Sequence, residues 1–453
     1  SIFIREYKVS EIDRKKLERI TTAEIDTSKR QYANKLGKQM LVFRGRGGSG
    51  KTVRLLNLAY QAYDEFGMRV LILTYNKTLV ADISRQMKLA KVNNNVGGRG
   101  IAVKTLHSFM YTWLCMLTNK TYIEDFFTEY DDFLNENLIE VVTDSDIEKA
   151  RSKASADLVW DIIMIDESQD WPMAERDVLF KLYGHEKMII ADGEDQLVRG
   201  VVRTDWRAGI NRSETQVVTL RKSLRLKSSL CNAVVKFANK IDYKWKLDPV
   251  LESHGGRVVV VLGAPLSERF HRRLWKTIDD SKNSPIDMLA CVPPEMTKET
   301  KNPDYLDGNG EKEFIKRSLI GLKYESWGKE VWDAVEDNEK TNFPTSLDQF
   351  RIVQYDSCRG LEGWIVVNYE IDKFFEYKKR SVKITEQDRL DMFFNEQTFA
   401  EDFAKRWLMI TLTRAIDTLI LHISDKQSYI GKLLTELAED NPVNSAATFK
   451  CVL

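Results

Sequence analysis

Cysteine is scarce in this sequence, and its five residues lie far apart with no C-x-x-C pair among them. This spacing excludes a disulfide framework and a zinc site built on cysteine pairs, and it is typical of proteins in a reducing compartment. No apolar run approaches the roughly 20 residues that a membrane-spanning helix needs. No signal-peptide pattern is present either. We therefore expect a cytoplasmic protein that has no membrane partner.

The sequence also lacks a charge imbalance, because 68 lysines and arginines are matched by 68 aspartates and glutamates. No overall positive field therefore attracts polyanions, and any site for them must be a local basic cleft. The composition, 43% apolar and 30% charged, is that of an ordinary globular protein, and 453 residues are enough for two or more domains. No internal repeat or low-complexity tract is apparent.

The sequence does contain a glycine-rich loop at residues 45–52, GRGGSGKT, between an apolar run and a helix-like run. The pattern G-x-x-x-x-G-K-[ST] is typical of a phosphate-binding loop. Backbone N–H groups wrap the phosphates, the Lys51 ammonium reaches the outer phosphates, and the Thr52 hydroxyl ligates magnesium. The dipole of the following helix adds to the attraction. We expect ATP and Mg²⁺ to bind at Gly45, Gly48, Ser49, Gly50, Lys51 and Thr52.

An apolar run at 162–165 leads directly into the acidic pair Asp166 and Glu167. A magnesium nucleotide site needs such a pair: Asp166 holds the metal through water, and Glu167 orients or deprotonates the attacking water. The alternative is a helix N-terminus with acidic residues in its first turn. The phosphate loop upstream favours the metal site.

Apolar runs alternate with helical patterns along the first half, which predicts an α/β fold with a parallel sheet. Ligands of such sheets meet the loops at the carboxyl ends of the strands. Two such loops carry candidate ligand contacts: Tyr75 and Asn76 in the first, Thr105 and His107 in the second. Taken alone, His107 is better explained as a buried core histidine.

Two segments of the first half are highly charged. Residues 1–30 predict a solvated lead-in with a surface helix. Residues 124–148 hold ten carboxylates and no lysine or arginine, interleaved with aromatic residues. We expect an acidic helical insertion at 110–158 that packs on its own aromatic side chains and repels phosphate backbones.

The second half continues the alternation, with strand-like runs at 257–262, 286–291, 350–355, 365–369 and 418–422. Two α/β domains are therefore expected, at 31–218 and 219–453. The polar, turn-rich stretch 297–346 is predicted to be a surface insertion. A basic cluster is predicted to be a solvated face: Lys378, Lys379, Arg380 and Lys383.

In order, these motifs resemble those of the superfamily 1 helicases of the UvrD/Rep type, over residues 31–422. The phosphate loop is similar to the first motif of that family. The segments 105–109, TLHSF, and 166–170, DESQD, are similar to its Thr-Phe-His-Ser segment and its Asp-Glu-x-Gln-Asp box. Residues 357–362, SCRGLE, resemble its Ser-x-Lys-Gly-Leu-Glu motif.

The resemblance implies a role for each matching residue. Gln31 would read the adenine, and Gln196 would couple the nucleotide state to the strand. Arg225 would face the γ-phosphate, and Arg414 would act as an arginine finger. Glu362 would also contribute to nucleotide binding. Single-stranded nucleic acid would contact Tyr75, Asn76, Thr105, His107, Trp206, Ser357 and Arg359.

The sequence departs from the family in two places that concern nucleic acid. Arg359 stands where the family usually has lysine, which is a mild change for a phosphate contact. The residues after Gln196 lack the aromatic that stacks on a base in the family, and Trp206 or Tyr75 would have to replace it.

By resemblance, the architecture would be two RecA-like domains with ATP in the cleft between them. The expected function is an ATP-dependent translocase or helicase on single-stranded nucleic acid, moving 3′ to 5′, with DNA favoured over RNA. The alternative is an ATP-gated regulatory subunit that controls a partner such as a nuclease, which neutral net charge and the acidic insertion favour. A small-molecule kinase has no use for two arginine motifs in a second α/β half.

Overall fold

The computed structural model describes most of the chain. The described residues are 9–22, 32–93, 99–135, 141–193, 203–245, 247–248, 254–263, 267–306, 312–382, 384, 395–439 and 449–452. Gln31, Gln196 and Lys383 lie outside them. No helix among these residues is long and apolar enough to cross a membrane.

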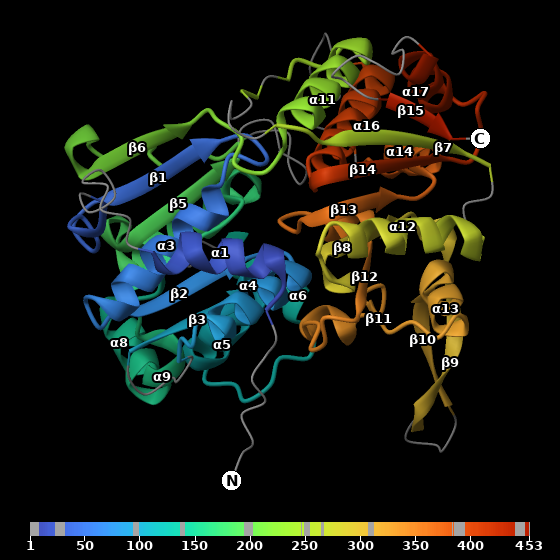
Figure 1. The fold of residues 1–453 in the computed structure, drawn as a ribbon. Coiled ribbons are helices and arrows are strands. Elements are labelled where there is room, and N and C mark those ends of the chain that lie inside the picture. The colour runs from blue at the N-terminus through green and yellow to red at the C-terminus, as the bar shows by residue number, and fades with distance from the viewer. Residues whose placement is uncertain are drawn as a thin grey trace. The chain divides into compact units, whose positions relative to one another are not determined.

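The chain divides into two compact units (Figure 1). The N-terminal unit consists of Lys16–Arg46 and Gly50–Leu220, and the C-terminal unit of Ser1–Lys15, Gly47–Ser49 and Arg221–Leu453. Each unit contains one large sheet, and every strand pairing in these two sheets is parallel. The α/β class with parallel sheets, predicted from the sequence, is therefore confirmed.

The sheet of the N-terminal unit has six strands in the order β3-β2-β4-β5-β1-β6. Their bounds are β1 Met40–Gly45, β2 Arg69–Thr74, β3 Gly100–Thr105, β4 Ile162–Ile165, β5 Met188–Gly193 and β6 Thr215–Leu220. The central strands are buried along their whole length, because helices cover both faces of a parallel sheet. This explains why β4 reads as a continuous apolar run and not as an alternating pattern.

Two hydrophobic cores lie on the two faces of this sheet. On one face, α3 (Lys51–Asp64) and α4 (Lys77–Leu89) pack against strand residues such as Phe43 and Ile72. On the other face, α5 (Leu106–Thr118) and α10 (Met173–Tyr183) pack against Val42 and Leu73. Successive strand residues alternate between the two cores, as the pleat of a strand requires.

The acidic segment forms helices that join the second of these cores. They are α6 (Phe126–Asn135), α8 (Asp144–Lys153) and the short α9 (Ser155–Leu158). Phe126 stacks on Tyr130 with ring centroids 5.2 Å apart, and Tyr130 stacks on Phe133 at 6.5 Å. The predicted packing of this segment on its own aromatic side chains is therefore present.

The sheet of the C-terminal unit has seven strands in the order β11-β12-β8-β13-β14-β7-β15. Their bounds are β7 Arg257–Leu262, β8 Met288–Val292, β11 Val331–Asp333, β12 Phe350–Gln354, β13 Gly363–Asn368, β14 Ala415–Ile423 and β15 Phe449–Val452. Its helices are α11 Ser228–Lys240, α12 Glu268–Asp280, α13 Leu319–Ser326, α14 Ile371–Ser381, α16 Glu396–Leu412 and α17 Tyr429–Glu439. One core cluster joins α12 and α13 to this sheet through Leu274 and Tyr324.

Three sequence-based expectations about exposed segments need correction. The lead-in is not simply solvated: α1 (Glu11–Thr21) buries Ile20 completely, and the Asn57 amide donates to the Ile20 carbonyl at 2.8 Å. Apolar residues spaced along a helix can bury one of its faces even when most of its residues are charged.

The stretch 297–346 is a surface insertion only in part. It begins with an antiparallel hairpin of β9 (Thr297–Leu306) and β10 (Lys312–Ser318). It continues through α13 and β11, where Tyr324 and Trp332 are buried. The many turn residues of this stretch favoured a surface insertion, so the sequence did not predict that its second part is buried.

Lys378 of the basic cluster is also buried. Its ammonium forms an ion pair with Asp356 and lies 4.1 Å from the ring centroid of Trp407. A buried ammonium needs such a partner, because losing its hydration costs free energy. The sequence shows the four positive charges of this cluster, but it does not show that Asp356 and Trp407 contact Lys378.

His271 in α12 gives the C-terminal unit a pH-dependent stability. Its ring is fully buried, with Nδ1 2.8 Å from the Ser267 carbonyl oxygen and Nε2 2.7 Å from the Tyr369 hydroxyl. These partners fit a neutral ring in which Nδ1–H donates and Nε2 accepts. Burial lowers the pKa of His271 to about 4, although the Ser267 carbonyl raises it in part.

Because the unfolded chain takes up this proton near pH 6.5 and the folded chain near pH 4, stability should fall as the pH drops through that window. We expect His271 to account for about 2 kcal/mol of the unfolding free energy lost between pH 7 and pH 5. In urea unfolding at pH 7 and at pH 5, the free energy of unfolding of His271→Phe should change between the two pH values by about 2 kcal/mol less than that of the unchanged chain. The exposed His254, changed to Gln, is the control. A pH dependence unchanged by His271→Phe would contradict the assignment.

Candidate functional site

The parallel order of the N-terminal sheet places five strand ends along one edge. The strands β1 to β5 all run in the same direction, so the loops that follow them begin at the same edge. These loops carry the phosphate-binding pattern, the acidic pair and both candidate nucleic-acid segments. Residues that are far apart in the sequence are thereby collected where α/β sheets bind ligands.

The phosphate loop has the backbone that its glycines predict. Gly48 and Gly50 both have φ near +84°, in the left-handed region that residues with a Cβ rarely adopt. Lys51 begins α3, is buried, and donates from Nζ to the carbonyl oxygens of Gly45 at 2.9 Å and Arg46 at 3.2 Å. Its ammonium is therefore held over the loop that would receive phosphates.

A second observation at this loop fits an anionic ligand. The Ser49 hydroxyl is buried and has no hydrogen-bond partner among the described residues. A buried hydroxyl without a partner costs free energy, and a phosphate oxygen would supply the missing acceptor. The loop therefore fits a nucleotide phosphate by its own stereochemistry.

Thr52 and Asp166 meet beneath the loop. The Thr52 hydroxyl donates to Oδ2 of Asp166 at 2.8 Å, and the Glu167 N–H donates to Oδ1 at 2.9 Å. Asp166 is only 1% exposed. Burial, and after it the charge of Glu167, raises the pKa of Asp166, whereas the Thr52 hydroxyl and the Lys51 ammonium oppose the rise.

This pair of oxygen donors fits magnesium. Mg²⁺ is held in nucleotide sites by one or two protein oxygens, with phosphate oxygens and waters completing the coordination. Among the described residues no group of three or more His, Cys, Asp or Glu side chains could hold a metal by itself. A hydroxyl and one carboxylate fit a metal ion whose other ligands come from a nucleotide and from water.

Glu167 is held in place by a residue that sequence reasoning did not single out. Gln169 donates from Nε2 to Oε2 of Glu167 at 2.8 Å, and its Oε1 accepts from the N–H of Gly193 at 2.7 Å. A Cβ on Gly193 would lie 2.7 Å from Nε2 of Gln169, so a larger residue at this position would displace the Gln169 amide. The amide thus connects Glu167 to the end of β5.

The backbone at Glu167 is unusual for a residue with a side chain. Its φ is +54°, in the left-handed region, which costs a non-glycine residue free energy. Strain of this kind persists where surrounding contacts fix the conformation. Two such contacts run from the Glu167 N–H to Asp166 and from the Gln169 amide to the Glu167 carboxylate.

Aromatic side chains surround His107 at the ends of β2 and β3. The ring centroid of His107 lies 5.5 Å from that of Tyr75 and 5.4 Å from that of Phe127 in α6. The Tyr75 hydroxyl donates to the buried carboxylate of Glu175, whose other oxygen accepts from Tyr130 at 3.0 Å. Two predicted nucleic-acid residues, Tyr75 and His107, are thus neighbours, and the acidic segment packs against them.

Trp206 lies in the core. It is 3% exposed, its Nε1–H donates to the Ser168 carbonyl at 2.9 Å, and its ring packs against Trp171 at 5.8 Å. A base cannot stack on a ring that is covered in this way. The burial of Trp206 therefore contradicts the prediction that its ring stacks on a base.

Asn76 and Thr105 are helix N-caps. Asn76 accepts from the N–H of Thr78 at 3.0 Å at the start of α4, and Thr105 accepts from the N–H of Ser108 at 3.3 Å at the start of α5. Capping satisfies backbone donors that a helix leaves without partners. Their positions at the sheet edge are as predicted, and a contact with nucleic acid stays a prediction.

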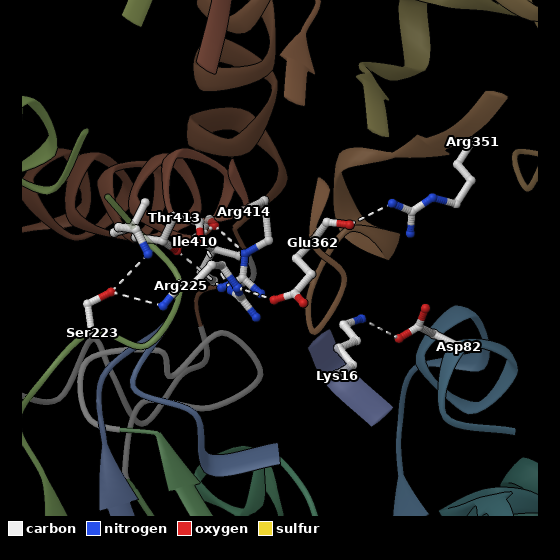
Figure 2. A network of polar contacts seen from close by, with 10 residues as sticks. Lys16, Asp82, Ser223, Arg225, Arg351, Glu362, Ile410, Thr413 and Arg414 are labelled. Carbon is white, nitrogen blue, oxygen red and sulfur yellow. Dashed lines mark hydrogen bonds and ion pairs between the residues drawn. The ribbon is translucent and has the colours of Figure 1, made fainter. Parts of the chain in front are cut away.

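Arg225 and Arg351 of the C-terminal unit form hydrogen bonds with other groups of the protein (Figure 2). Arg225 donates from Nε to Oε2 of Glu362 at 2.6 Å and from Nη1 to the Thr413 carbonyl at 3.1 Å. Arg351 donates to the Glu362 carbonyl at 2.6 Å. Arg225, Glu362 and Thr413, which come from three separate motifs, therefore meet in one network.

Arg414 belongs to the same network (Figure 2). It is 2% exposed and donates to the Ile410 carbonyl at 2.8 Å and to the Thr413 hydroxyl at 3.1 Å. A guanidinium at the carboxyl end of α16 also meets the negative end of the helix dipole. A finger role would require Arg414 to leave these partners.

Ser357 and Arg359 follow the carboxyl end of β12. Ser357 is half-buried, and Arg359 is 8% exposed. Gly360 next to them has φ +81°, so this turn needs the conformational freedom of glycine. The positions of Gln31 and Gln196 lie outside the described residues, so their predicted roles stay predictions.

Comparisons with known proteins give a likeness of fold only. No protein-family model matches the chain, and no curated protein matches it. Among solved structures, the crystal structure of Arterivirus nonstructural protein 10 (helicase) is 13% identical and has a TM-score of 0.31, with 89% of this chain and 64% of that chain covered. The complex of Arterivirus nonstructural protein 10 (helicase) with DNA is 11% identical at a TM-score of 0.34, with 89% and 65% covered.

This chain therefore spans less than two thirds of the length of either helicase. Both TM-scores are low. What the fold and site define is an α/β protein with a phosphate-binding loop and an acidic pair at one sheet edge.

Gln169 should act as a positioning residue for Glu167. A hydrogen bond to a charged group contributes about 1.5–3 kcal/mol, so Gln169→Ala should slow the ATP hydrolysis that we propose for this site by about tenfold to a hundredfold. ATP affinity, measured by equilibrium binding, should stay close to that of the unchanged chain. Gln61→Ala, which also truncates a buried glutamine of this unit, is the control and should leave the turnover number unaltered. An equal effect of both substitutions on turnover would mean that Gln169 is only structural.

Proposed function

We propose that the chain is a magnesium-dependent ATPase that moves along single-stranded nucleic acid. The observation that carries the proposal is the contact of Thr52 with the buried Asp166 beneath the phosphate loop, with Glu167 held beside it. Loop, hydroxyl and acidic pair are the parts that hydrolysis of a nucleoside triphosphate requires. Lys51, Thr52, Asp166 and Glu167 all belong to the N-terminal unit.

In this proposal the residues of the site have separate roles. Lys51 exchanges its loop carbonyl partners for the outer phosphates, and Glu167 orients the attacking water. Magnesium, when bound with ATP, supplies positive charge that offsets the charge developing on the phosphates. Thr52 and Asp166 hold it, directly or through water.

Arg225 and Arg414 complete the proposed machinery. Charge that develops on the γ-phosphoryl group is stabilised by guanidinium groups, which are always protonated. For this role Arg225 must exchange Glu362, and Arg414 the Ile410 carbonyl, for phosphate. A turnover that breaks and remakes these bonds would couple hydrolysis to movement of the polypeptide.

The nucleic-acid part of the proposal assigns contacts to Tyr75, Asn76, Thr105, His107, Ser357 and Arg359. The resemblance of the motifs to superfamily 1 helicases favours single-stranded DNA over RNA and movement from 3′ to 5′. The chain's own support is the placement of Tyr75 and His107 together at the sheet edge that also carries the phosphate loop. In a cell we propose a cytoplasmic location.

A second function is favoured by the acidic helix α6. Its carboxylates would repel a phosphate backbone, and the exposed ring of Phe127 lies among them. The chain would then be an ATP-gated regulatory subunit, with α6 as the docking face for a protein such as a nuclease. ATP turnover that ignores nucleic acid would support this alternative.

Lys51→Ala tests the nucleotide site and the motor together. Loss of the ammonium should lower ATP hydrolysis by about a hundredfold or more, because one lost charged donor removes transition-state stabilisation of that order. The unchanged chain should displace streptavidin from the 5′ end of a biotinylated oligonucleotide faster than from the 3′ end, and Lys51→Ala should displace neither. The exposed Lys38, changed to Ala, is the control.

Two results would contradict the proposal at different points. Full hydrolysis by Lys51→Ala would refute the nucleotide site. Normal hydrolysis by the unchanged chain without streptavidin displacement from either end would refute the motor and leave the ATPase intact.

A further inference from the structure

The helix α12 presents a row of positive charges to solvent. Four exposed cations occupy positions i, i+3, i+4 and i+7 of its outer face: Arg269, Arg272, Arg273 and Lys276. Its inner face is buried in the core through Leu274 and Ile278. The chain has a net charge of zero, so four neighbouring positive charges on one helix face are a local feature that requires a physical explanation.

Apart from the ion pair of Arg272 with Glu268, the helix gains no stability from this arrangement. Like charges four residues apart, such as Arg269 and Arg273, destabilise a helix by about 0.2–0.5 kcal/mol per pair. The helix dipole favours acids in the first turn and cations in the last. Glu268 meets this preference, whereas Arg269 near the start and Asp279 and Asp280 at the end oppose it. Stability therefore does not account for the row.

Neighbouring carboxylates neutralise little of it. Arg272 pairs with Glu268 at 2.5 Å, and the Arg272 side chain is still 69% exposed. In the part of the chain that the structure describes, Arg269, Arg273 and Lys276 form no ion pair. Three full charges therefore face solvent along about two turns of helix.

A fifth cation enlarges the positive surface. Lys329 follows α13, and its ammonium lies 4.7 Å from the ring centroid of Trp275 in α12. The contact fixes this charge beside the helix, because a cation is attracted to the face of an indole. The positive surface therefore extends from one element to the next.

We propose that α12 is a second nucleic-acid contact, which binds the phosphate backbone through Arg269, Arg272, Arg273 and Lys276. The forked guanidinium of arginine matches phosphate oxygens, and three of the four cations are arginines. The row spans seven residues, about 10 Å of helix, which is long enough to meet more than one phosphate of a strand. An anionic membrane is a poorer occupant, because the large apolar residues of α12 pack into the core and none is free to enter a bilayer.

This surface contributes binding and no chemistry. It would hold nucleic acid on the C-terminal unit independently of the nucleotide, and its contribution would fall steeply with salt. The inference rests on the proposed function only for the identity of the polyanion. Binding is therefore measured apart from hydrolysis, so that each can fail alone.

The test is the fluorescence anisotropy of a labelled oligothymidylate with the full chain, without nucleotide, over a series of salt concentrations. The triple variant Arg269→Gln, Arg273→Gln, Lys276→Gln should bind at least about tenfold more weakly at low salt. Its slope of log affinity against log salt should be smaller by about 2, since each phosphate contact of a single strand contributes about 0.7. Its melting temperature should not fall, because the substitutions relieve repulsion.

Two further variants sharpen the comparison. Lys240→Gln, Lys426→Gln and Lys432→Gln together remove three exposed charges elsewhere in the same unit and should leave affinity and slope unchanged. Arg269→Lys with Arg273→Lys keeps the charges and should retain most of the affinity. Basal ATP hydrolysis should be the same in every variant.

Three outcomes would overturn the inference. The first is unchanged affinity and slope in the α12 triple variant, and the second is an equal loss in both triple variants. The third is loss of binding to phosphatidylserine vesicles by the α12 variant while its oligonucleotide affinity is unchanged. If the unchanged chain hydrolyses ATP but binds no oligonucleotide, the proposed motor and this inference both fail. If oligonucleotide binding is lost only in the α12 triple variant, the inference is supported even when the chain does not hydrolyse ATP.

Discussion

The hydrogen bond between Thr52 and Asp166 is the contact on which the proposed chemistry depends. It joins the first turn of α3 to the end of β4, although β4 and the strand before the phosphate loop are not neighbours in the sheet. The strand β5 lies between them. Gln169 accepts a hydrogen bond from Gly193 at the end of β5 and donates one to Glu167. The order of parallel strands therefore positions both the proposed metal donors and the residue that would orient water.

Local patterns were sufficient to predict the parts of the fold that are themselves local. The apolar run of β4 and the glycines of the phosphate loop have one physical explanation each, so the strand and the turn could be placed from sequence. The burial of Ile20 and Lys378 depends on partners from distant segments. The sequence showed Gln169 only as part of a motif. Its contact with Gly193 could not be predicted, because the two residues are brought together by the folded sheet.

The net charge of zero hides an uneven distribution of charge over the protein. Acidic side chains gather on α6 beside the aromatic residues around His107, whereas cations gather on the outer face of α12 in the other unit. Equal numbers of acids and bases thus leave surfaces of opposite sign. Such surfaces steer different partners, and a polyanion would be attracted to one and repelled by the other.

The most direct test of the proposed function is the steady-state rate of ATP hydrolysis at low salt, with and without single-stranded DNA, single-stranded RNA and duplex DNA. A motor predicts strong, saturable stimulation by a single strand and little by duplex. Measurable basal turnover that no nucleic acid changes would contradict the motor and favour an ATPase controlled by a protein partner.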